Sequence, residues 1–282
     1  MHTEGVVLRH LDWMRVRNLS RLTIESRHYT VMILGRWLEG PILYASHDQL
    51  AAWQVERSRQ VSPATRRNDL TNVREFYRWA NREGFRTDDP TARLLMPRSP
   101  RRFPRPIDDD KLVQAFAVAD PPMAAILGLA AFAGLRACEI ARLDWSEVMV
   151  TANPPILHVV RGKGDRSRMV PLAPALVELL QALPYRHGPV IRRADGGHGH
   201  TAANAVTKRA SAFLHDLGHP ETLHALRHRF ATAAYRVSRD IRAVQDLLGH
   251  ASPTTTSIYA AVSPGVTVAT VAAASDLRGR AA

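Results

Sequence analysis

Cysteine and lysine are scarce in this chain of 282 residues, and long apolar runs are absent. Cys138 is the only cysteine, so an internal disulfide is excluded and the sequence offers no thiolate metal site. No apolar run approaches the ~20 residues that a membrane helix needs. The N-terminus lacks an apolar stretch followed by a small-residue cleavage site, so no secretory signal is expected. These absences predict a cytoplasmic protein without a membrane partner.

Positive charge is abundant and consists almost entirely of arginine. The chain has 38 basic and 26 acidic residues, a formal net charge of +12, and Lys111, Lys163 and Lys208 are its only lysines. Residues 1–105 hold 19 arginines against 11 acidic residues, so most of the excess lies in the N-terminal part. Such a balance suggests a polyanionic partner, and guanidinium groups can bind two phosphate oxygens at once. DNA is the expected partner, although a soluble basic surface could have the same composition.

Residues 1–96 are predicted to form a helical domain. Apolar residues between Leu22 and Leu38 follow helical spacing, and Gly40-Pro41 ends that helix. Ser62-Pro63 is typical of an N-cap followed by proline at the first helical position, and the helix behind it runs to about Gly84. Asp89-Pro90 is expected to open a short last helix. Four arginines lie along the Ser62 helix, and at least some should touch phosphate if the basic excess is functional: Arg66, Arg67, Arg74 and Arg78.

The next residues indicate a linker and a second domain. Residues 97–106 contain four prolines and four arginines, which predicts an extended basic linker. Residues 107–282 begin with three aspartates, Asp108 to Asp110, that place negative charge at a helix N-terminus. A buried helix follows from Met123 to Ala133, and residues 156–172 alternate around a Gly-Lys-Gly-Asp turn like a β-hairpin. The predicted fold class is therefore mainly α (α+β), with a small antiparallel sheet in the second domain.

Five separated signals in residues 107–282 carry polar side chains suited to chemistry. Arg136 follows a helix break at Gly134, and Lys163 occupies the hairpin turn. His224 and Arg227 lie three residues apart on one helix face. The last two signals are His250, directly after a helix-ending glycine, and Tyr259, nine residues later. Each signal taken alone has an ordinary structural interpretation, such as a surface charge, a solvated turn lysine, a core histidine or a half-buried tyrosine.

In combination and order these residues resemble the signature of the tyrosine recombinase (phage integrase) family. That signature is Arg, Lys, His-x-x-Arg, His or Trp, then Tyr, and all six positions are filled. The segments LHALRHRFAT at 223–232 and VQDLLGHAS at 244–252 match as well. The resemblance covers nearly the whole chain, since residues 1–96 look like the family's core-binding helical bundle.

The resemblance implies DNA strand exchange through a 3′-phosphotyrosine, without metal, nucleotide or other cofactor. Tyr259 would be the nucleophile, and Arg136 and Arg227 would stabilise the charged transition state. His224 would add a donor or help to deprotonate the tyrosine, and Lys163 would protonate the leaving 5′-hydroxyl. His250 would donate to the phosphate or orient the tyrosine. One further residue, Glu139, is expected to position the arginine and the lysine rather than to react.

Other functions remain open beside the expected phage or mobile-element integrase. A chromosome-dimer resolvase of the Xer type has the same signature, a type IB topoisomerase-like enzyme shares the chemistry, and a non-catalytic DNA-binding regulator could have kept the fold. Metal sites at His198/His200 or His224/His228 lack the carboxylate support that such sites need.

The resemblance also implies a homotetramer on DNA, which would associate with the nucleoid. Residues 266–278 are expected to form a helix that docks into a neighbouring protomer. The ending Ala281-Ala282 resembles the Ala-Ala ending that bacterial energy-dependent proteases read, although an arbitrary frayed tail would have the same appearance.

Overall fold

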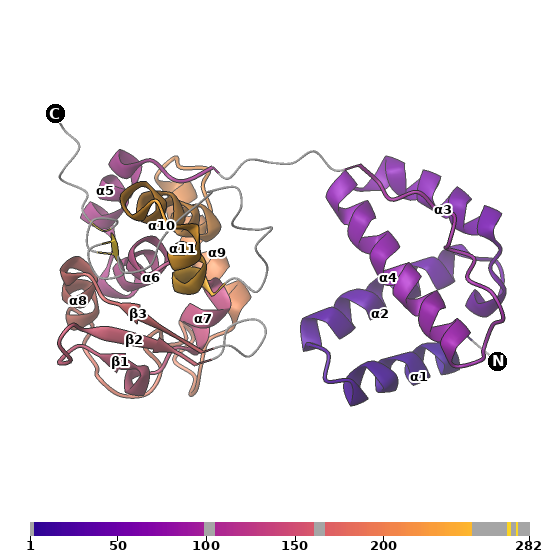
Figure 1. The fold of residues 1–282 in the computed structure, drawn as a ribbon, viewed down its shortest axis with the longest axis horizontal. Helices are drawn as coiled ribbons and strands as arrows, with labels where there is room; N and C mark the ends of the chain where they lie inside the picture. The colour runs from indigo at the N-terminus through magenta and orange to yellow at the C-terminus, as the bar shows by residue number, and fades with distance from the viewer. Residues whose placement is uncertain (1–2, 99–104, 161–166, 250–269, 272–274, 276–282) are drawn as a thin grey trace. The chain divides into compact units, whose positions relative to one another are not determined.

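The structure, a computed structural model, describes residues 3–98, 105–160, 167–249, 270–271 and 275. The chain divides into two compact units, Met1–Arg102 and Phe103–Ala282 (Figure 1). Each unit has a hydrophobic core of its own. The finer boundaries predicted from the sequence, at residues 96 and 107, stay predictions. None of the described helices is long and apolar enough to cross a membrane.

The N-terminal unit is a bundle of α-helices, as the sequence predicts. Its elements are α1 (Thr3–Val16), α2 (Arg21–Trp37), the short 3-10 helix η1 (Ile42–Tyr44), α3 (His47–Gln60) and α4 (Pro63–Arg82). The predicted start of α4 is confirmed, because the Ser62 hydroxyl accepts a hydrogen bond from Thr65 N at 3.2 Å and proline follows at the first helical position. Large aromatic side chains fill the core, among them Phe76, Tyr77 and Trp79 of α4.

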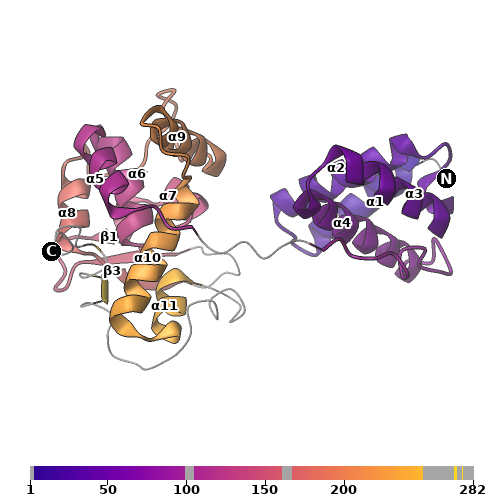
Figure 2. The same cartoon turned by 90° about the horizontal axis from the view of Figure 1, so that it is seen from above.

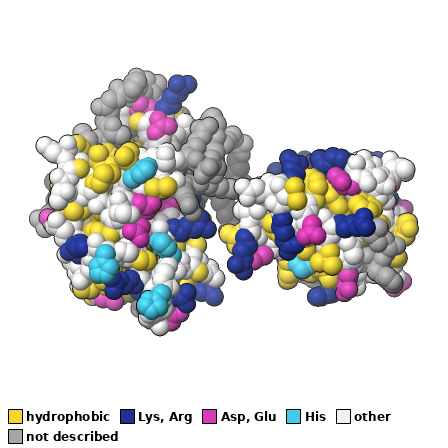
Figure 3. Space-filling model, turned by 90° about the horizontal axis from the view of Figure 1, so that it is seen from below, with side chains coloured by type: hydrophobic (Ala, Val, Ile, Leu, Met, Phe, Trp, Pro, Cys, Tyr) yellow, Lys and Arg dark blue, Asp and Glu magenta, His cyan; other side chains and the backbone are white. Residues whose placement is uncertain are grey.

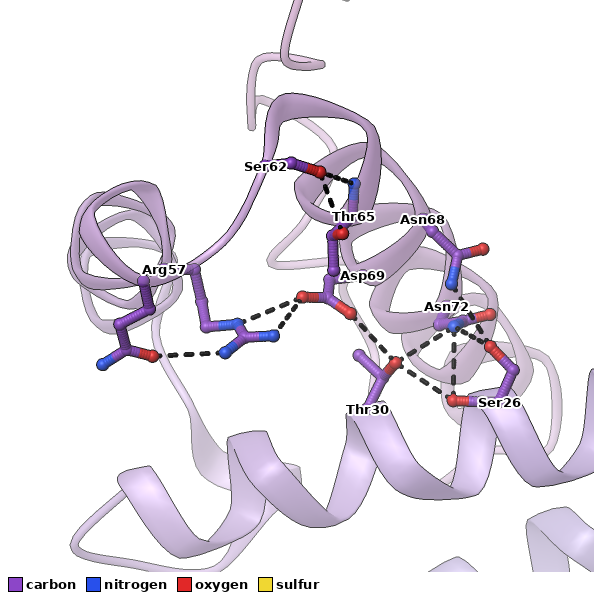
Figure 4. A network of polar contacts seen from close by, with 9 residues as sticks. Ser26, Thr30, Arg57, Ser62, Thr65, Asn68, Asp69 and Asn72 are labelled. Carbon is purple, nitrogen blue, oxygen red and sulfur yellow. Dashed lines mark hydrogen bonds and ion pairs between the residues drawn. The ribbon is translucent and has the colours of Figure 1, made fainter. Parts of the chain in front are cut away.

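A buried polar network joins three of these helices (Figure 4). Arg57 of α3 donates two hydrogen bonds to Asp69 Oδ2 of α4, at 3.1 and 2.7 Å. Asp69 Oδ1 accepts from the Thr30 hydroxyl of α2, and Asn72 Nδ2 donates to the same hydroxyl at 3.0 Å. The carboxylate is thus satisfied by a charged and a neutral donor, which keeps the cost of its burial low.

The helix expected at Asp89-Pro90 does not form. Residues 90–93 make a turn instead, in which Asp89 Oδ1 accepts hydrogen bonds from the Thr91 amide and hydroxyl. The Arg74 side chain donates to the Leu94 carbonyl and holds the segment against α4. Proline at position 97 also disfavours helical geometry at the residue before it. The Asp89 cap therefore forms, but the chain behind it makes only a turn, which a contact from α4 holds in place.

The arginines of α4 separate into two classes. Arg74 donates a hydrogen bond to the Leu94 carbonyl and Arg66 is half-buried, whereas Arg67 and Arg78 are exposed. On the face of the N-terminal unit shown in Figure 3, arginine side chains appear at several places. Only part of the basic excess is therefore available to a partner.

The C-terminal unit is mostly helical with one small sheet (Figures 1 and 2). Its described elements are α5 (Asp109–Val118), α6 (Pro121–Phe132), α7 (Ala137–Arg142), the 3-10 helix η2 (Trp145–Glu147), β1 (Val148–Met149), β2 (Ile156–Val159), β3 (Arg168–Pro171), α8 (Pro174–Gln181), α9 (Ala203–Asp216), α10 (Leu223–Ser238) and α11 (Ile241–Leu248).

Helix α6 is the centre of this unit. All residues from Met123 to Phe132 are buried, and the helix contacts α7, α8, α9 and α10. The sheet has the order β1-β2-β3 with both pairs antiparallel, and Leu157 faces Val170 in the β2–β3 pair. The buried helix and the hairpin strands predicted from the sequence are confirmed, and so is the mainly α (α+β) class.

The aspartate run at the start of the unit acts partly as expected. Helix α5 begins at Asp109, but the Asp108 side chain makes no capping hydrogen bond. Asp109 instead forms an ion pair with Arg229 of α10 at 2.7 Å, and Lys111 forms one with Glu221 at 2.6 Å. These ion pairs attach the first helix of the unit to the segment and helix that carry His224 and Arg227.

Candidate active site

Arg136 stands at the N-cap of α7, where the chain leaves α6 through a sharp reversal. Gly134 makes that reversal with φ +64°, and a Cβ there would lie 2.8 Å from Phe230 Cε1 and 2.9 Å from Leu248 Cδ2. Glycine is therefore required for both its backbone conformation and its size. The turn at Gly134 therefore determines the position of the Arg136 backbone, and with it the point from which the Arg136 side chain projects.

Glu139 lies one turn into α7 and its side chain is fully buried. One oxygen, Oε2, accepts the Arg136 backbone N–H at 2.8 Å, and Oε1 accepts Arg136 Nη1 at 2.9 Å. Arg168 of β3 donates to both oxygens, each at 2.9 Å. Burial alone would raise the pKa of Glu139, but the hydrogen bonds and charges of Arg168, the Arg136 amide and Arg227 outweigh it, so the net pKa lies below the usual value. The carboxylate is therefore ionised at neutral pH, as a positioning role requires.

Arg227 projects from α10 and is 3% exposed. It donates to the Gly134 carbonyl and, at 2.7 Å, to the Leu248 carbonyl, and its Nη1 lies 3.7 Å from Glu139 Oε2. Burial, and then the neighbouring Arg136 charge, lowers the pKa of Arg227 to about 9. The guanidinium therefore still carries its charge at neutral pH.

His224 lies one turn before Arg227 on α10, close enough to Arg227 and Arg136 for their charges to affect its pKa. Burial, followed by the charges of Arg227 and Arg136, lowers the pKa of His224. Its ring makes an edge-to-face contact with His228, with centroids 4.3 Å apart. Burial, and then the charges of His224 and Arg227, lowers the pKa of His228 to about 4. Neutral rings at pH 7 allow His224 to donate one hydrogen bond or accept one proton, depending on its tautomer.

The C-terminal end of α11 is held by the same arginines. Three consecutive carbonyls each accept from a different guanidinium: Leu247 from Arg168 at 2.7 Å, Leu248 from Arg227 at 2.7 Å, and Gly249 from Arg136 at 3.1 Å. These carbonyls have no partner inside the helix, and they form the negative end of its dipole. The chain is therefore anchored directly before His250.

This arginine cluster, defined as Arg136, Arg168, Arg227 and Glu139, has a net charge of +2. Three guanidinium groups and one carboxylate converge from α7, β3 and α10. A phosphodiester carries one negative charge, and its pentavalent transition state carries two. Such a cluster can stabilise the transition state more than the ground state.

The structure brings together three of the six residues expected to be catalytic: Arg136, His224 and Arg227. The other three, Lys163, His250 and Tyr259, lie outside the described residues. In the sequence, Lys163 falls between strands β2 and β3, and His250 follows Gly249 directly.

Arg168 was missed by the sequence analysis. A signal existed, because Arg168 alternates with the buried residues Val170 and Leu172 along one face of the hairpin. An arginine on the buried face of a strand needs a carboxylate partner.

Three further expectations concern a metal site, the segment 266–278 and the C-terminal alanines. In the described part of the chain no group of three or more His, Cys, Asp or Glu residues is arranged to hold a metal ion. His200 lies 4.0 Å from an Asp144 carboxylate oxygen. Within 266–278 only Thr270, Val271 and Ser275 are described; they are helical, and Val271 belongs to the core of the C-terminal unit. Ala281-Ala282 lies outside the described residues.

Comparison with known proteins gives the same assignment over both units. The Phage integrase family matches residues 107–265, and the family's N-terminal SAM-like domain matches residues 10–84. Tyrosine recombinase XerC of Pseudomonas entomophila strain L48 is 34% identical over 258 residues, which cover 82% of this chain and 84% of XerC. Tyrosine recombinase XerD of Caulobacter vibrioides is 31% identical and covers 76% of this chain and 75% of XerD.

Solved structures extend the comparison to the fold. The integrase of mycobacterium phage Brujita is 28% identical, covers 97% of this chain and 93% of its own, and has a TM-score of 0.53. A lambda integrase (75–356) dimer bound to a COC′ core site has a TM-score of 0.75 at 19% identity, covers 90% of this chain and 97% of its own, and shows the shared fold. On these matches, the chain belongs to the tyrosine recombinase (phage integrase) family, whose members cleave and rejoin DNA through a tyrosine intermediate.

Proposed function

We propose that this chain recombines DNA at specific sites with Tyr259 as its nucleophile. The observation that carries the proposal is the arginine cluster, in which two guanidinium groups from the family signature share one buried carboxylate beside His224. In the proposed step the Tyr259 oxygen attacks the scissile phosphorus. The bond to O5′ breaks and the product is a 3′-phosphotyrosine with a free 5′-hydroxyl. Because the covalent link retains the energy of the ester, a partner strand's 5′-hydroxyl can reverse the reaction.

Each remaining residue has a part in this step. Arg136 and Arg227 donate to the non-bridging oxygens as charge develops on them. His224 contributes a further donor or takes the tyrosine proton, and Lys163 gives its proton to the departing O5′. His250 donates to the phosphate or orients Tyr259. The guanidinium charges supply the electrostatic stabilisation, so the proposed step calls for neither a metal ion nor a nucleotide.

The N-terminal unit is proposed to bind double-stranded DNA through its exposed arginines. Exposed side chains such as Arg67 and Arg78 can neutralise backbone phosphates, whereas Arg57 and Arg74 are committed to internal contacts.

We propose that a homotetramer forms on two duplexes in the nucleoid, with residues 266–278 docking into a neighbour. Deleting 266–282 without any loss of cooperative site binding would argue against that docking. Recognition of Ala281-Ala282 by a bacterial protease is a separate proposal, and an unchanged cellular half-life after replacing both alanines with aspartate would refute it.

Two biological roles compete for this chemistry. Integration and excision of a phage or mobile element is the preferred role, supported by the Brujita integrase, which matches nearly the full length of both chains. A chromosome-dimer resolvase is the second candidate, supported by the identity to XerC and XerD.

The test is capture of covalent DNA adducts from cells that express the protein. The protein is purified under denaturing conditions and the attached DNA is sequenced, with Tyr259→Phe as the control. Adducts at one or a few sites that disappear in the control support the proposal, and the position of those sites separates an attachment site from a dimer-resolution site. Adducts scattered over the genome would indicate a topoisomerase-like activity. Specific binding without any adduct, including on a nicked substrate that traps the intermediate, would indicate a regulator.

A further inference from the structure

We propose that Arg168 is a positioning residue for DNA cleavage, a role that rests on the proposed function of the arginine cluster. Arg168 is not one of the six residues of the family signature. It is inferred to hold Glu139 and the end of α11 so that Arg136 and Arg227 are presented to the scissile phosphate.

The contact between Arg168 and Glu139 is a buried, two-pronged ion pair. The Arg168 side chain is 7% exposed, and its Nη1 and Nη2 atoms each lie 2.9 Å from a different oxygen of Glu139. Two parallel charge-assisted hydrogen bonds fix both the distance and the plane of the carboxylate. Glu139 is therefore held where Oε1 also accepts Arg136 Nη1, and it does not rotate toward Arg227.

Occupation of both carboxylate oxygens affects Arg227 directly. Arg227 Nη1 lies 3.7 Å from Glu139 Oε2, which is beyond a normal hydrogen bond. If Arg168 were lost, Oε2 would keep only the Arg136 backbone N–H and would draw Arg227 closer, because the buried carboxylate would have lost one of its two hydrogen-bonded guanidinium partners. The guanidinium would then turn toward the carboxylate and away from the phosphate position.

Arg168 also fixes the chain in front of His250. Its Nε donates to the Leu247 carbonyl at 2.7 Å. Gly249 packs so closely on the same guanidinium that a Cβ at Gly249 would lie 2.8 Å from Arg168 Nη1. One side chain therefore connects β3, which follows Lys163 in the sequence, to α7 and to the end of α11.

Lysine cannot replace these contacts. An ammonium group is a point donor on a flexible stem, and it cannot hold both oxygens of Glu139 and the Leu247 carbonyl in one plane. Arg168→Lys retains the positive charge but loses the fixed arrangement of hydrogen bonds to Glu139 and to the Leu247 carbonyl. Displacements of about 1 Å can cost on the order of 10²-fold in rate, so cleavage should slow by about that factor.

The experiment measures single-turnover cleavage by the full-length chain. The substrate is a nicked duplex that carries a site mapped by covalent capture, and its concentration is varied to separate the maximal rate from the half-saturating concentration. We expect Arg168→Lys to lower the maximal rate by about 10²-fold and to change the half-saturating concentration by less than about threefold. Arg57→Lys is the control, since it disrupts another largely buried ion pair, in which Arg57 donates two hydrogen bonds to one oxygen of Asp69 in the other unit.

A double-mutant cycle tests whether Arg168 acts through Glu139. Arg168→Gln combined with Glu139→Gln should cleave no more slowly than Glu139→Gln alone, because the two residues would act as one unit. Losses that multiply would overturn the inference, and so would an Arg168→Lys protein that cleaves at the wild-type maximal rate. If Arg168→Lys failed to fold, judged by circular dichroism, the cycle would decide. A wild-type chain that formed no adduct would overturn the proposed function itself.

Discussion

At the scale of single residues, the charge of the active site is set by burial and by pairing. The pKa of Glu139 lies below its usual value, and the pKa of Arg227, lowered to about 9, still exceeds neutral pH. The lowered pKa of His224 keeps that ring neutral. The arginine cluster therefore keeps its net charge of +2 throughout the neutral range, and any pH dependence of cleavage near neutrality should come from other groups.

His10 of α1 gives a prediction about stability. It is 1% exposed, both ring nitrogens lack a hydrogen-bond partner among the described residues, and Trp13, Phe76 and Trp79 surround it. Burial, then the charges of Arg27 and Arg82, lowers the pKa of His10 from 6.5 to about 3.

Between pH 6.5 and about 3, His10 is therefore protonated in the unfolded chain but neutral in the folded chain. Stability from His10 is fully present above pH 6.5 and is lost as pH falls, by at most about 1.4 kcal/mol per pH unit. His10→Phe should flatten this slope, measured as the urea unfolding free energy by tryptophan fluorescence from pH 4 to 8. His10→Leu serves as a second variant in case phenylalanine overpacks the site. An unchanged slope in both variants would assign the pH dependence to other groups.

Single residues also show where sequence reasoning stops. Arg136, His224 and Arg227 could be predicted because each belongs to a spaced signature. Alternation places Arg168 on the buried face of its strand, but the pattern does not identify its partner Glu139, which lies 29 residues away. A polar residue that acts through a distant contact becomes recognisable only when the strands and helices are placed.

At the scale of elements, the sequence predicted those helix ends and strands that depend on residues close to them in the chain. The start of α4, the end of α11 at Gly249 and the hairpin strands follow from caps and alternation. The helix expected at Asp89-Pro90 does not form, and the Leu94 carbonyl instead accepts from the Arg74 side chain, 20 residues away in sequence, which no local pattern predicts. The turn from α6 into α7 was predicted only in part. The sequence predicted the helix break at Gly134, but not the contact of the Gly134 carbonyl with Arg227.

Gly134 makes that turn, and its replacement should damage the site. Gly134→Ala places a methyl group against Phe230 and Leu248 in a backbone conformation that L-residues disfavour. It also shifts the carbonyl that accepts from Arg227. We expect Gly134→Ala to lower the melting temperature and to slow single-turnover cleavage by at least about tenfold.

The matched control for this change is Gly218→Ala. Gly218 has φ +78° and nothing within 4 Å of the added Cβ, so its alanine variant meets only the conformational cost of about 1–2 kcal/mol. Equal cleavage by the two variants at a temperature where both are folded would show that the turn matters for stability alone.

At the scale of the whole molecule, two cores and an uneven charge suggest a division of labour. The N-terminal and C-terminal units bury separate clusters of apolar side chains. Residues 1–102 hold 18 arginines and 11 acidic residues, a net charge of +7 out of the total of +12. The residues expected to be catalytic lie in the second unit, whereas the larger share of the net positive charge lies in the first.

This division predicts how the two halves behave when they are separated. Fragments 1–102 and 103–282 should each unfold cooperatively, because each keeps its own core. Fragment 103–282 should bind the target site more weakly than the full chain, with a shallower dependence of affinity on salt. Each lost phosphate contact reduces the slope of log K against log salt by about 0.9. The measurements are thermal melts of both fragments and DNA titrations at several salt concentrations. If fragment 103–282 matched the full chain in affinity and salt slope, the arginines of the N-terminal unit would have a role other than holding DNA.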